Sequence, residues 1–195
     1  MKLAAVVLAA GSGTRYGGGK LLAPWRGGVL LDGALAAACA APVDKVYVTW
    51  GADPAVLAAT TAFAVRAPKG ERLVLVHAPR YDEGLSASLA AGVAAAPAEI
   101  DGVFVFLGDM PRIPVGLTAR MAQALAAGAD AVATEFEGRR GHPVLFGRRL
   151  LPQLTTLKGD RGAGELLSGL GEALKLIPAP DDGVLYDVDR PGDLA

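Results

Sequence analysis

The sequence has little of what metal-binding, disulfide-bonded or nucleic-acid-binding proteins depend on. It contains one cysteine, Cys39, and two histidines in 195 residues, too few for a Cys/His zinc site or a disulfide within the chain. The formal net charge is −1 at pH 7, so no basic excess favours nucleic acid. No apolar stretch is long enough to cross a bilayer, and the short N-terminal run leads straight into a glycine loop, as a buried first strand would. We therefore expect a cytoplasmic protein that binds neither nucleic acid nor a membrane.

Aromatic residues are also scarce, at 6%, whereas apolar residues reach 52%, with alanine prominent among them. Strands are predicted at 3–9, 45–51, 72–78, 102–109 and 130–137, and helices at 31–41, 54–65, 85–96 and 115–127. This alternation predicts an α/β fold: a Rossmann-like three-layer sandwich with a mostly parallel sheet and helices on both faces. We expect one domain, 1–195, with a nucleotide-binding part (1–136) and an acceptor-side and C-terminal part (137–195). Cys39, in an alanine-rich helix, is expected to be a small buried residue.

Ligands of such sheets bind beyond the carboxyl ends of the strands, and the first strand is followed there by GSGTRYGGGK (11–20). The dinucleotide fingerprint fails because Tyr16 takes its third glycine position, and the Walker pattern fails because Thr14 takes its first. Glycine amides can form a concave nest for an anion, while Arg15 offers a bidentate fork and Lys20 a compact charge. We interpret the segment as a triphosphate loop; the alternative is a glycine-rich turn with solvated charges.

Two further segments supply carboxylates. The apolar strand in VFVFLGDMP ends at Asp109, where a divalent cation that bridges phosphates would need an oxygen ligand; a turn or helix-cap aspartate is the alternative. In YDVDRPGDL, Asp187 and Asp189 share one face if the segment is extended. Either can add a second carboxylate to the metal, and we favour Asp189, whereas Asp193 is expected to cap a final turn.

The motifs LAAGSGTRYGGGKLL, GDMP and DVDRPGDL resemble those of the nucleotidyltransferases that make sugar nucleotides, CDP-methylerythritol and the dinucleotide forms of the molybdenum cofactor. The resemblance extends from Val6 to Leu194. It implies the nucleotidyltransferase fold, an NTP substrate, Mg²⁺ on Asp109 and on one of Asp187 and Asp189, of which we favour Asp189, and catalytic roles for Arg15, Lys20 and Asp109. The residues that it implies for nucleotide binding are Leu8, Ala9, Ala10, Gly11, Gly13, Arg15, Lys20, Ser88 and Asp109. Ser86, nearby in YDEGLSASLAAGV, is expected either to contact the base or to cap the helix.

The segments RRGHPVLF (139–146) and LKGDRGAGELL (157–167) resemble the acceptor-side motifs of molybdenum cofactor cytidylyltransferases, in the MobA-like NTP transferase family. The resemblance implies acceptor binding by His142, Asp160 and Arg161. Arg139 and Arg140 are candidates for the phosphate of the acceptor or are solvated charges. Ala10, where guanylyltransferases of this group usually have glycine, favours CTP over GTP.

We therefore predict a Mg²⁺-dependent enzyme that transfers CMP from CTP to a phosphate-bearing small molecule, best guessed as molybdenum-bound molybdopterin, and releases pyrophosphate. A molybdoenzyme or its chaperone is a further candidate partner. Two alternatives stay open. The chain can be an NAD(P)-dependent reductase on a related scaffold, or a non-catalytic carrier of the molybdenum cofactor.

Overall fold

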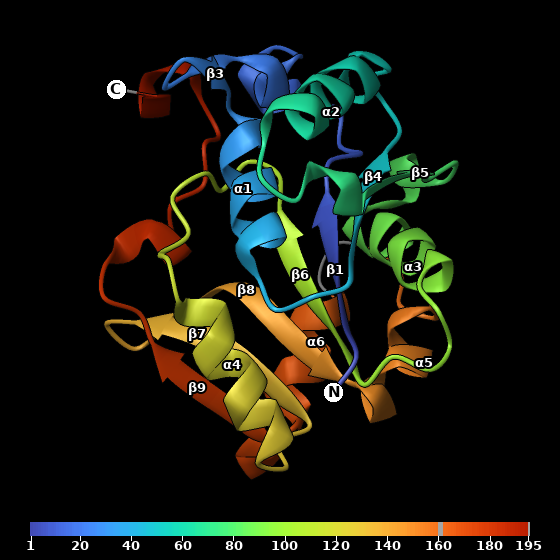
Figure 1. Ribbon diagram of the computed structural model, residues 1–195, viewed down its shortest axis with the longest axis vertical. Helices are drawn as coiled ribbons and strands as arrows, with labels where there is room; N and C mark the ends of the chain where they lie inside the picture. Colours follow the sequence, from blue (N-terminus) through green and yellow to red (C-terminus); the bar gives the residue numbers. More distant parts are fainter. Residues whose placement is uncertain (160–161, 195) are drawn as a thin grey trace.

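The computed structural model describes residues 1–159 and 162–194, and a seven-stranded sheet with the order β5-β4-β1-β6-β8-β7-β9 forms its centre (Figure 1). The strands are β1 (Leu3–Leu8), β4 (Lys45–Trp50), β5 (Leu73–His77), β6 (Gly102–Leu107), β7 (Ala131–Phe136), β8 (Arg139–Gly147) and β9 (Leu174–Pro178). β1 pairs in parallel with β4 and β6, β4 with β5, and β7 with β9. Only β8 among these strands runs against its neighbours, β6 and β7. The predicted α/β class with a mostly parallel sheet is confirmed.

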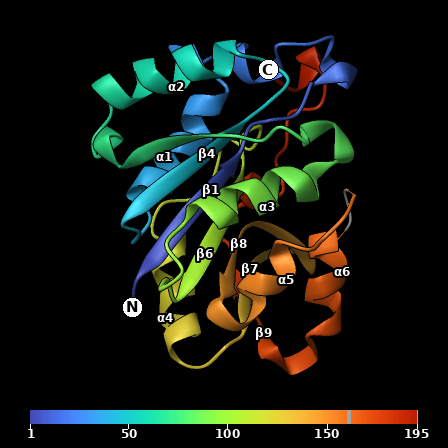
Figure 2. The same ribbon diagram turned by 90° about the vertical axis from the view of Figure 1, so that its right-hand side faces the viewer.

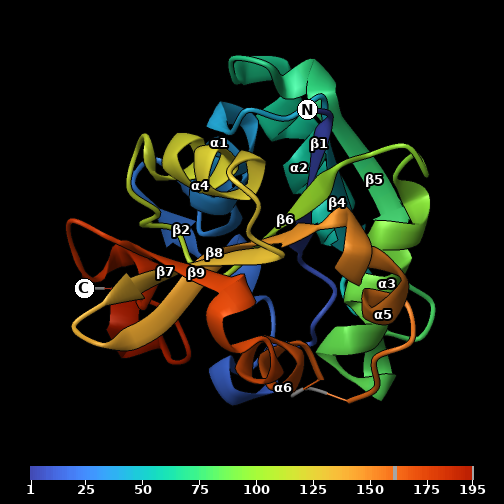
Figure 3. The same ribbon diagram turned by 90° about the horizontal axis from the view of Figure 1, so that it is seen from below.

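Helices cover both faces of the sheet (Figures 2 and 3). One face packs on α1 (Leu31–Ala40), α2 (Ala55–Arg66) and α4 (Leu117–Ala126), and the other on α3 (Leu85–Ala95), α5 (Leu151–Leu154) and α6 (Gly162–Gly169). Alternate residues of β1 serve the two cores, because side chains along a strand point to opposite faces: Leu3, Ala5 and Val7 on one side, Ala4, Val6 and Leu8 on the other. This double burial is why β1 reads as an uninterrupted apolar run.

Small side chains let the helices approach the sheet closely. A Cβ added at Gly92 of α3 would lie 2.5 Å from Cγ1 of Val6, so only glycine fits there. In α1, Cys39 is 3% exposed, and burial raises the pKa of its thiol. The expectation that Cys39 is a small buried residue is therefore confirmed.

The C-terminal segment lies at the side of the molecule where β1 and β6 end (Figure 1). A short hairpin of β2 (Pro24–Trp25) and β3 (Gly28–Val29) follows the glycine loop, and the C-terminal segment lies beside it (Figure 1). Trp25 of the hairpin contacts Tyr186 of the C-terminal segment, with 6.3 Å between the ring centroids. Across residues 1–159 and 162–194, no helix combines the length and the apolar character that a membrane crossing requires.

Candidate active site

The candidate site lies where the neighbouring strands β1 and β6 end. β1 ends at Leu8 and leads into the glycine loop, while β6 ends at Leu107 and is followed by Gly108 and Asp109. The Gly108 N–H donates to the Leu8 carbonyl at 3.0 Å, and a Cβ at Gly108 would lie 2.9 Å from that oxygen. The glycine of the Gly-Asp pair therefore ties the two loops together, and this contact sets the position of Asp109 beside the glycine loop.

Lys20 joins the two acidic segments. It begins the short 3₁₀ helix η2 (Lys20–Leu22), and its Nζ lies 2.6 Å from Oδ2 of Asp109 and 3.6 Å from Oδ1 of Asp189. The Lys20 side chain is 13% exposed, against 23% for Asp109 and 44% for Asp189. One ammonium group therefore bridges carboxylates from two distant parts of the chain, in a partly desolvated position where the electrostatic contact is strong.

The glycine loop adopts a compact turn around Gly13. The Gly13 carbonyl accepts hydrogen bonds from the N–H groups of Tyr16 and Gly18, at 3.0 and 3.2 Å. Gly13 has φ +58°, and a Cβ there would lie 3.1 Å from Cβ of Lys20. Gly13 thus has a conformational role and also leaves room for Lys20. Arg15 lies in the 3₁₀ helix η1 (Thr14–Tyr16), and its side chain falls outside what the structure describes.

A cavity of about 210 Å³, called the loop cavity here, lies between these segments. Its lining comprises Leu8, Ala9, Gly11, Ser12, Gly13, Gly19, Lys20, Leu21, Asp53, Val56, Leu85, Leu107 and Asp109. Some backbone groups near it already have hydrogen-bond partners within the protein. The Ala9 N–H donates to the Thr49 carbonyl at 3.1 Å, and the Ala10 carbonyl accepts from the Ala52 N–H at 3.1 Å. Of the segment predicted to lie near the base, Leu8, Ala9 and Gly11 line this cavity, whereas Ala10 is not among its described lining residues.

Asp53 is a lining residue that the sequence analysis missed. It follows the end of β4, and its Oδ1 accepts a hydrogen bond from the Ala55 N–H at 2.9 Å at the start of α2. The rule that ligands gather beyond the carboxyl ends of parallel strands would have singled it out. Its carboxylate therefore has a capping role that can be seen in the structure, in addition to its place in the cavity wall.

The C-terminal segment holds Asp189 beside Lys20. The Val188 N–H donates to the Asp109 carbonyl at 3.1 Å, and Oδ2 of Asp193 accepts from the N–H groups of Asp189 and Arg190 at 2.9 and 2.7 Å. These two bonds lower the pKa of the Asp193 carboxyl. The expected turn-capping role of Asp193 is confirmed, and Asp189 is the residue of the Asp187–Asp189 pair that the structure places against Lys20.

A second cavity, of about 620 Å³ and called the α6 cavity here, shares Leu8, Leu85 and Leu107 with the loop cavity. Its remaining lining residues are Ser86, Leu89, Val105, Arg140, His142, Val144, Phe146, Ala163, Gly164, Glu165, Leu167 and Ser168. The wall is therefore largely apolar, with Arg140 and His142 from β8 and Glu165 from α6 as its charged or titratable members.

His142 is partly buried in this wall, and its Nδ1 lies 3.5 Å from the Val105 carbonyl. Burial lowers the pKa of His142, and the Val105 carbonyl and the carboxylates of Asp109 and Asp187 only partly oppose that effect. His142 is therefore neutral near pH 7. Arg140 donates from Nη2 to Oγ of Ser168 at 3.0 Å.

The other sequence-predicted residues are distributed differently. Arg139 lines a separate cavity with Asp182, Asp187 and Asp189. Ser86 and Ser88 are both buried on α3, but Ser88 lines neither the loop cavity nor the α6 cavity among the described residues. The capping role considered for Ser86 is wrong: α3 begins after Gly84 without a side-chain cap, because the Ser86 N–H is bonded to the Gly159 carbonyl at 3.1 Å. Asp160 and Arg161 lie outside the described residues.

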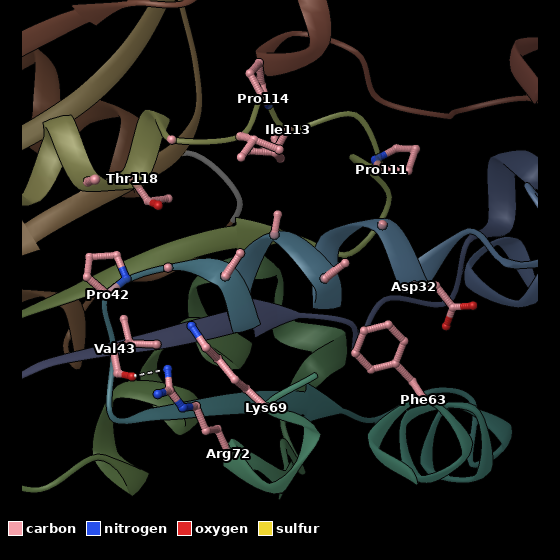
Figure 4. Close-up of a pocket in the computed structure, with 18 of the residues that line it drawn as sticks. Asp32, Pro42, Val43, Phe63, Lys69, Arg72, Pro111, Ile113, Pro114 and Thr118 are labelled. Atoms are coloured by element: carbon pink, nitrogen blue, oxygen red, sulfur yellow. Dashed lines mark hydrogen bonds between the residues drawn. The ribbon is translucent and has the colours of Figure 1, made fainter. Parts of the chain in front are cut away.

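A larger cavity, of about 1050 Å³, lies along α1 (Figure 4). Figure 4 shows Phe63, Lys69 and Arg72 on one side and Ile113 and Thr118 on the other. None of the described residues expected at the site belongs to its lining. Among the expected charged residues, Lys20 and Asp109 line the smaller loop cavity instead.

Asp109, which lines the loop cavity, and Asp189, which lines the cavity beside Arg139, fit one hard cation that also has phosphate ligands. Within the described part of the chain, no group of three or more His, Cys, Asp or Glu residues is placed to hold a metal. Asp109 and Asp189, however, both reach the same ammonium group. Mg²⁺ typically binds one or two carboxylates together with waters and substrate phosphates, which is the arrangement these residues can support.

Comparison with known proteins agrees with this geometry. Residues 5–174 match the model of the MobA-like NTP transferase domain. The chain belongs to this family.

Two relatives match over nearly the whole chain. The chain is 33% identical over 192 residues to the purine catabolism protein PucB of Bacillus subtilis (97% of this chain, 92% of PucB). It is 25% identical over 194 residues to the molybdenum cofactor cytidylyltransferase of Escherichia coli (96% of this chain, 91% of the relative). The crystal structure of Rv0371c from Mycobacterium tuberculosis H37Rv superposes with a TM-score of 0.83 at 28% identity, covering 99% of this chain and 95% of that one. The family and the fold make the chain a nucleotidyltransferase.

Proposed function

We propose that this nucleotidyltransferase moves CMP from CTP to a phosphate-bearing acceptor, best guessed as molybdenum-bound molybdopterin, and releases pyrophosphate. The observation that carries the proposal is the meeting of Lys20, Asp109 and Asp189 in one partly buried cluster beside the glycine loop. A cation and two carboxylates at the mouth of a glycine-rich loop suit a metal-bound triphosphate. The similarity to a molybdenum cofactor cytidylyltransferase supports the acceptor class, and Ala10 supports cytidine over guanosine.

In the proposed reaction, a phosphate oxygen of the acceptor attacks the α-phosphorus of CTP. A new P–O bond forms while the bond to the β-phosphate oxygen breaks, and pyrophosphate leaves with that electron pair. The amides of the glycine loop and Lys20, together with Arg15 on the sequence evidence, stabilise the charge that develops on the phosphate oxygens. Asp109 and Asp189 would hold Mg²⁺, which neutralises phosphate charge when bound. A manganese complex of the related Rv0371c, at 28% identity and a TM-score of 0.77, supports a divalent cation in this role.

The α6 cavity is the proposed acceptor site because it adjoins the loop cavity through shared lining residues. Its apolar wall suits a flat heterocyclic ring, and Arg140 can bind a phosphate through its guanidinium group. His142, neutral near pH 7, can donate or accept one hydrogen bond without adding charge. Asp160 and Arg161 complete the proposed acceptor contacts on the sequence evidence. A molybdoenzyme or its chaperone is the proposed recipient of the product.

The test is pyrophosphate release from CTP or GTP, with Mg²⁺, and with molybdopterin that either carries molybdenum or does not. Release that needs Mg²⁺ and the acceptor, and that is faster with CTP, is the expected result. Faster release with GTP would overturn the cytidine assignment alone. Release from neither nucleotide would reject the proposed reaction with this acceptor, and a binding assay with NADPH would then test the reductase alternative.

A further inference from the structure

Lys20 lies between the two carboxylates that are proposed to hold a metal ion. Its Nζ is 2.6 Å from Asp109 and 3.6 Å from Asp189, and its side chain is more buried than either carboxylate. An ammonium group at these distances satisfies the same oxygens that would ligate a divalent cation. The cluster is thus charge-compensated before any metal or nucleotide binds.

We propose that Lys20 is an internal counter-ion, which keeps the metal affinity of the nucleotide-free protein low until an NTP draws the ammonium group onto its phosphates. The proposal rests on the proposed function, since an NTP is the ligand that supplies those phosphates. It adds to that function an order of events: metal and nucleotide bind together, and the metal binds poorly by itself.

The first argument is electrostatic. A divalent cation on Asp109 Oδ2 would lie within a few ångströms of the Lys20 ammonium, and two positive charges at such a distance in a partly buried site repel strongly. Metal binding to the free protein must therefore break the contacts of Lys20 with Asp109 and Asp189, so that the ammonium group loses both carboxylate partners. The triphosphate removes this penalty because it offers Lys20 new anionic oxygens.

The second argument is the number of ligands. Among the described residues, the cluster has two carboxylates and no third His, Cys, Asp or Glu placed to join them. Mg²⁺ prefers octahedral coordination and loses its waters reluctantly, so two carboxylates alone hold it weakly. Phosphate oxygens complete the coordination at the same time as they bind Lys20.

The third argument is steric freedom in the loop before Lys20. Gly17, Gly18 and Gly19 all have positive φ angles, and a Cβ added at any of them would meet no atom within 4 Å. The segment therefore lies in open space, and glycine can adopt other backbone angles there at little steric cost. Lys20 can follow the phosphates by a local change in these residues and in its own four-carbon stem.

The test measures Mn²⁺ affinity, by electron paramagnetic resonance and calorimetry, without an acceptor and without turnover. In the wild-type protein a non-hydrolysable CTP analogue is expected to tighten Mn²⁺ binding at least about tenfold beyond the affinity of Mn²⁺ for the analogue alone, and Mn²⁺ must tighten analogue binding equally. In K20M, Mn²⁺ alone is expected to bind about tenfold more tightly than in the wild type, while the analogue binds more weakly. One substitution thus moves two affinities in opposite directions.

The controls separate charge from position. K45M removes a lysine charge on β4, where Lys45 Nζ donates to the Glu71 carbonyl at 3.4 Å, and it should leave both affinities unchanged. K20R, which keeps the charge, should retain weak Mn²⁺ binding. If K20M and K45M bind Mn²⁺ with equal affinity, Lys20 is not a counter-ion. If the CTP analogue leaves the Mn²⁺ affinity of the wild-type protein unchanged, metal and nucleotide binding are not coupled. These results need no transfer reaction, so they are independent of whether molybdopterin is the acceptor.

Discussion

The indole ring of Trp25 lies 6.3 Å from the phenol ring of Tyr186, and this contact joins the hairpin after the glycine loop to the segment that carries Asp189. The guanidinium carbon of Arg112 lies 4.5 Å from the centroid of the same Tyr186 ring. The Tyr186 hydroxyl donates to the Asp193 carbonyl. Because Asp193 also binds the backbone of Asp189, the stack holds one end of the acidic cluster in place.

The first prediction concerns Tyr186. Tyr186→Leu removes the ring contacts with Trp25 and Arg112, each worth about 1 kcal/mol. We expect a modest loss of thermal stability and a loss of turnover of about tenfold, because Asp189 is held less firmly near Lys20. Tyr186→Phe keeps the ring contacts and loses the hydroxyl bond to Asp193, so its loss of turnover should be smaller than that of Tyr186→Leu. Melting curves and pyrophosphate release measure the two effects, and full activity in Tyr186→Leu would contradict the positioning role.

A second prediction tests the carboxylate after β6. Asp109→Asn preserves shape but removes the charge that pairs with Lys20 at 2.6 Å. Turnover should fall well over tenfold, by about 100-fold, since the proposed Mg²⁺ site would lose a ligand, a change that commonly costs several kcal/mol. Asp101→Asn is the matched control at the opposite end of the same strand, where the carboxylate binds the Lys2 N–H and Arg148. Its turnover should stay near normal; an Asp109→Asn enzyme of similar activity would remove Asp109 from the mechanism.

Gly13 provides a third prediction, on the shape of the loop. Gly13→Ala places a methyl group 3.1 Å from Cβ of Lys20 and strains a residue with φ +58°. We expect the KM for the nucleotide to rise about tenfold, because Lys20 is pushed from its position. Gly17→Ala has a comparable backbone strain, at φ +98°, with no atom within 4 Å of the added Cβ. If both variants raise the KM equally, loop strain and not the contact with Lys20 is the cause.

The sequence predicted best those elements whose pattern is strong over a whole segment. β1, β4 and α1 agree with their predicted ranges within about two residues, because double burial or continuous alanine leaves little ambiguity. β9 was missed, since Leu174–Pro178 has one buried residue in five and forms an edge of the sheet. The reversed direction of β8 follows from a two-residue turn, Glu137–Gly138, with φ angles of 50° and 77°, a hairpin geometry that the Gly138 signal alone indicates weakly.

The residues of the site differ in the same way, since some follow from a local sequence pattern and others do not. Asp109 was predicted from the strand before it, because the carboxyl end of a buried strand restricts where the residue lies. The contact of Lys20 with Asp189 depends on how the C-terminal segment returns across the sheet, and no local pattern encodes that path. The resemblance to a family supplied Asp189 as a candidate, and the hydrogen bonds from Asp193 explain physically why it faces the loop.

A fourth prediction addresses acceptor binding. Arg140 lines the α6 cavity, whereas its neighbour Arg139 lines a different cavity among acidic residues, since adjacent residues of β8 point to opposite faces. Arg140→Gln should raise the KM for the acceptor about tenfold, the worth of one charge-assisted hydrogen bond, and leave the KM for CTP unchanged. Arg139→Gln is the paired control and should change neither constant. Equal effects of the two variants would place the acceptor outside the α6 cavity.

The fifth prediction uses the low pKa of His142. Burial lowers its pKa below the ordinary value of 6.5, so the unfolded chain binds a proton at pH values where the folded protein does not. The contribution of His142 to the free energy of unfolding is therefore fully present above pH 6.5. It decreases as the pH falls from 6.5 towards the pKa of the folded state, by at most about 1.4 kcal/mol per pH unit. Urea unfolding midpoints between pH 7.5 and about pH 5 should fall in the wild type.

His142→Gln should flatten that dependence, because the glutamine does not titrate. His77→Gln, which removes the other histidine at the exposed end of β5, is the matched variant, and an equal flattening in it would contradict the assignment to His142. A His142→Gln protein with an unchanged slope would mean that other groups cause the loss of stability. If the slope does flatten, His142 is neutral at pH 7 in the α6 cavity wall, where Arg140 is a lining residue that carries positive charge.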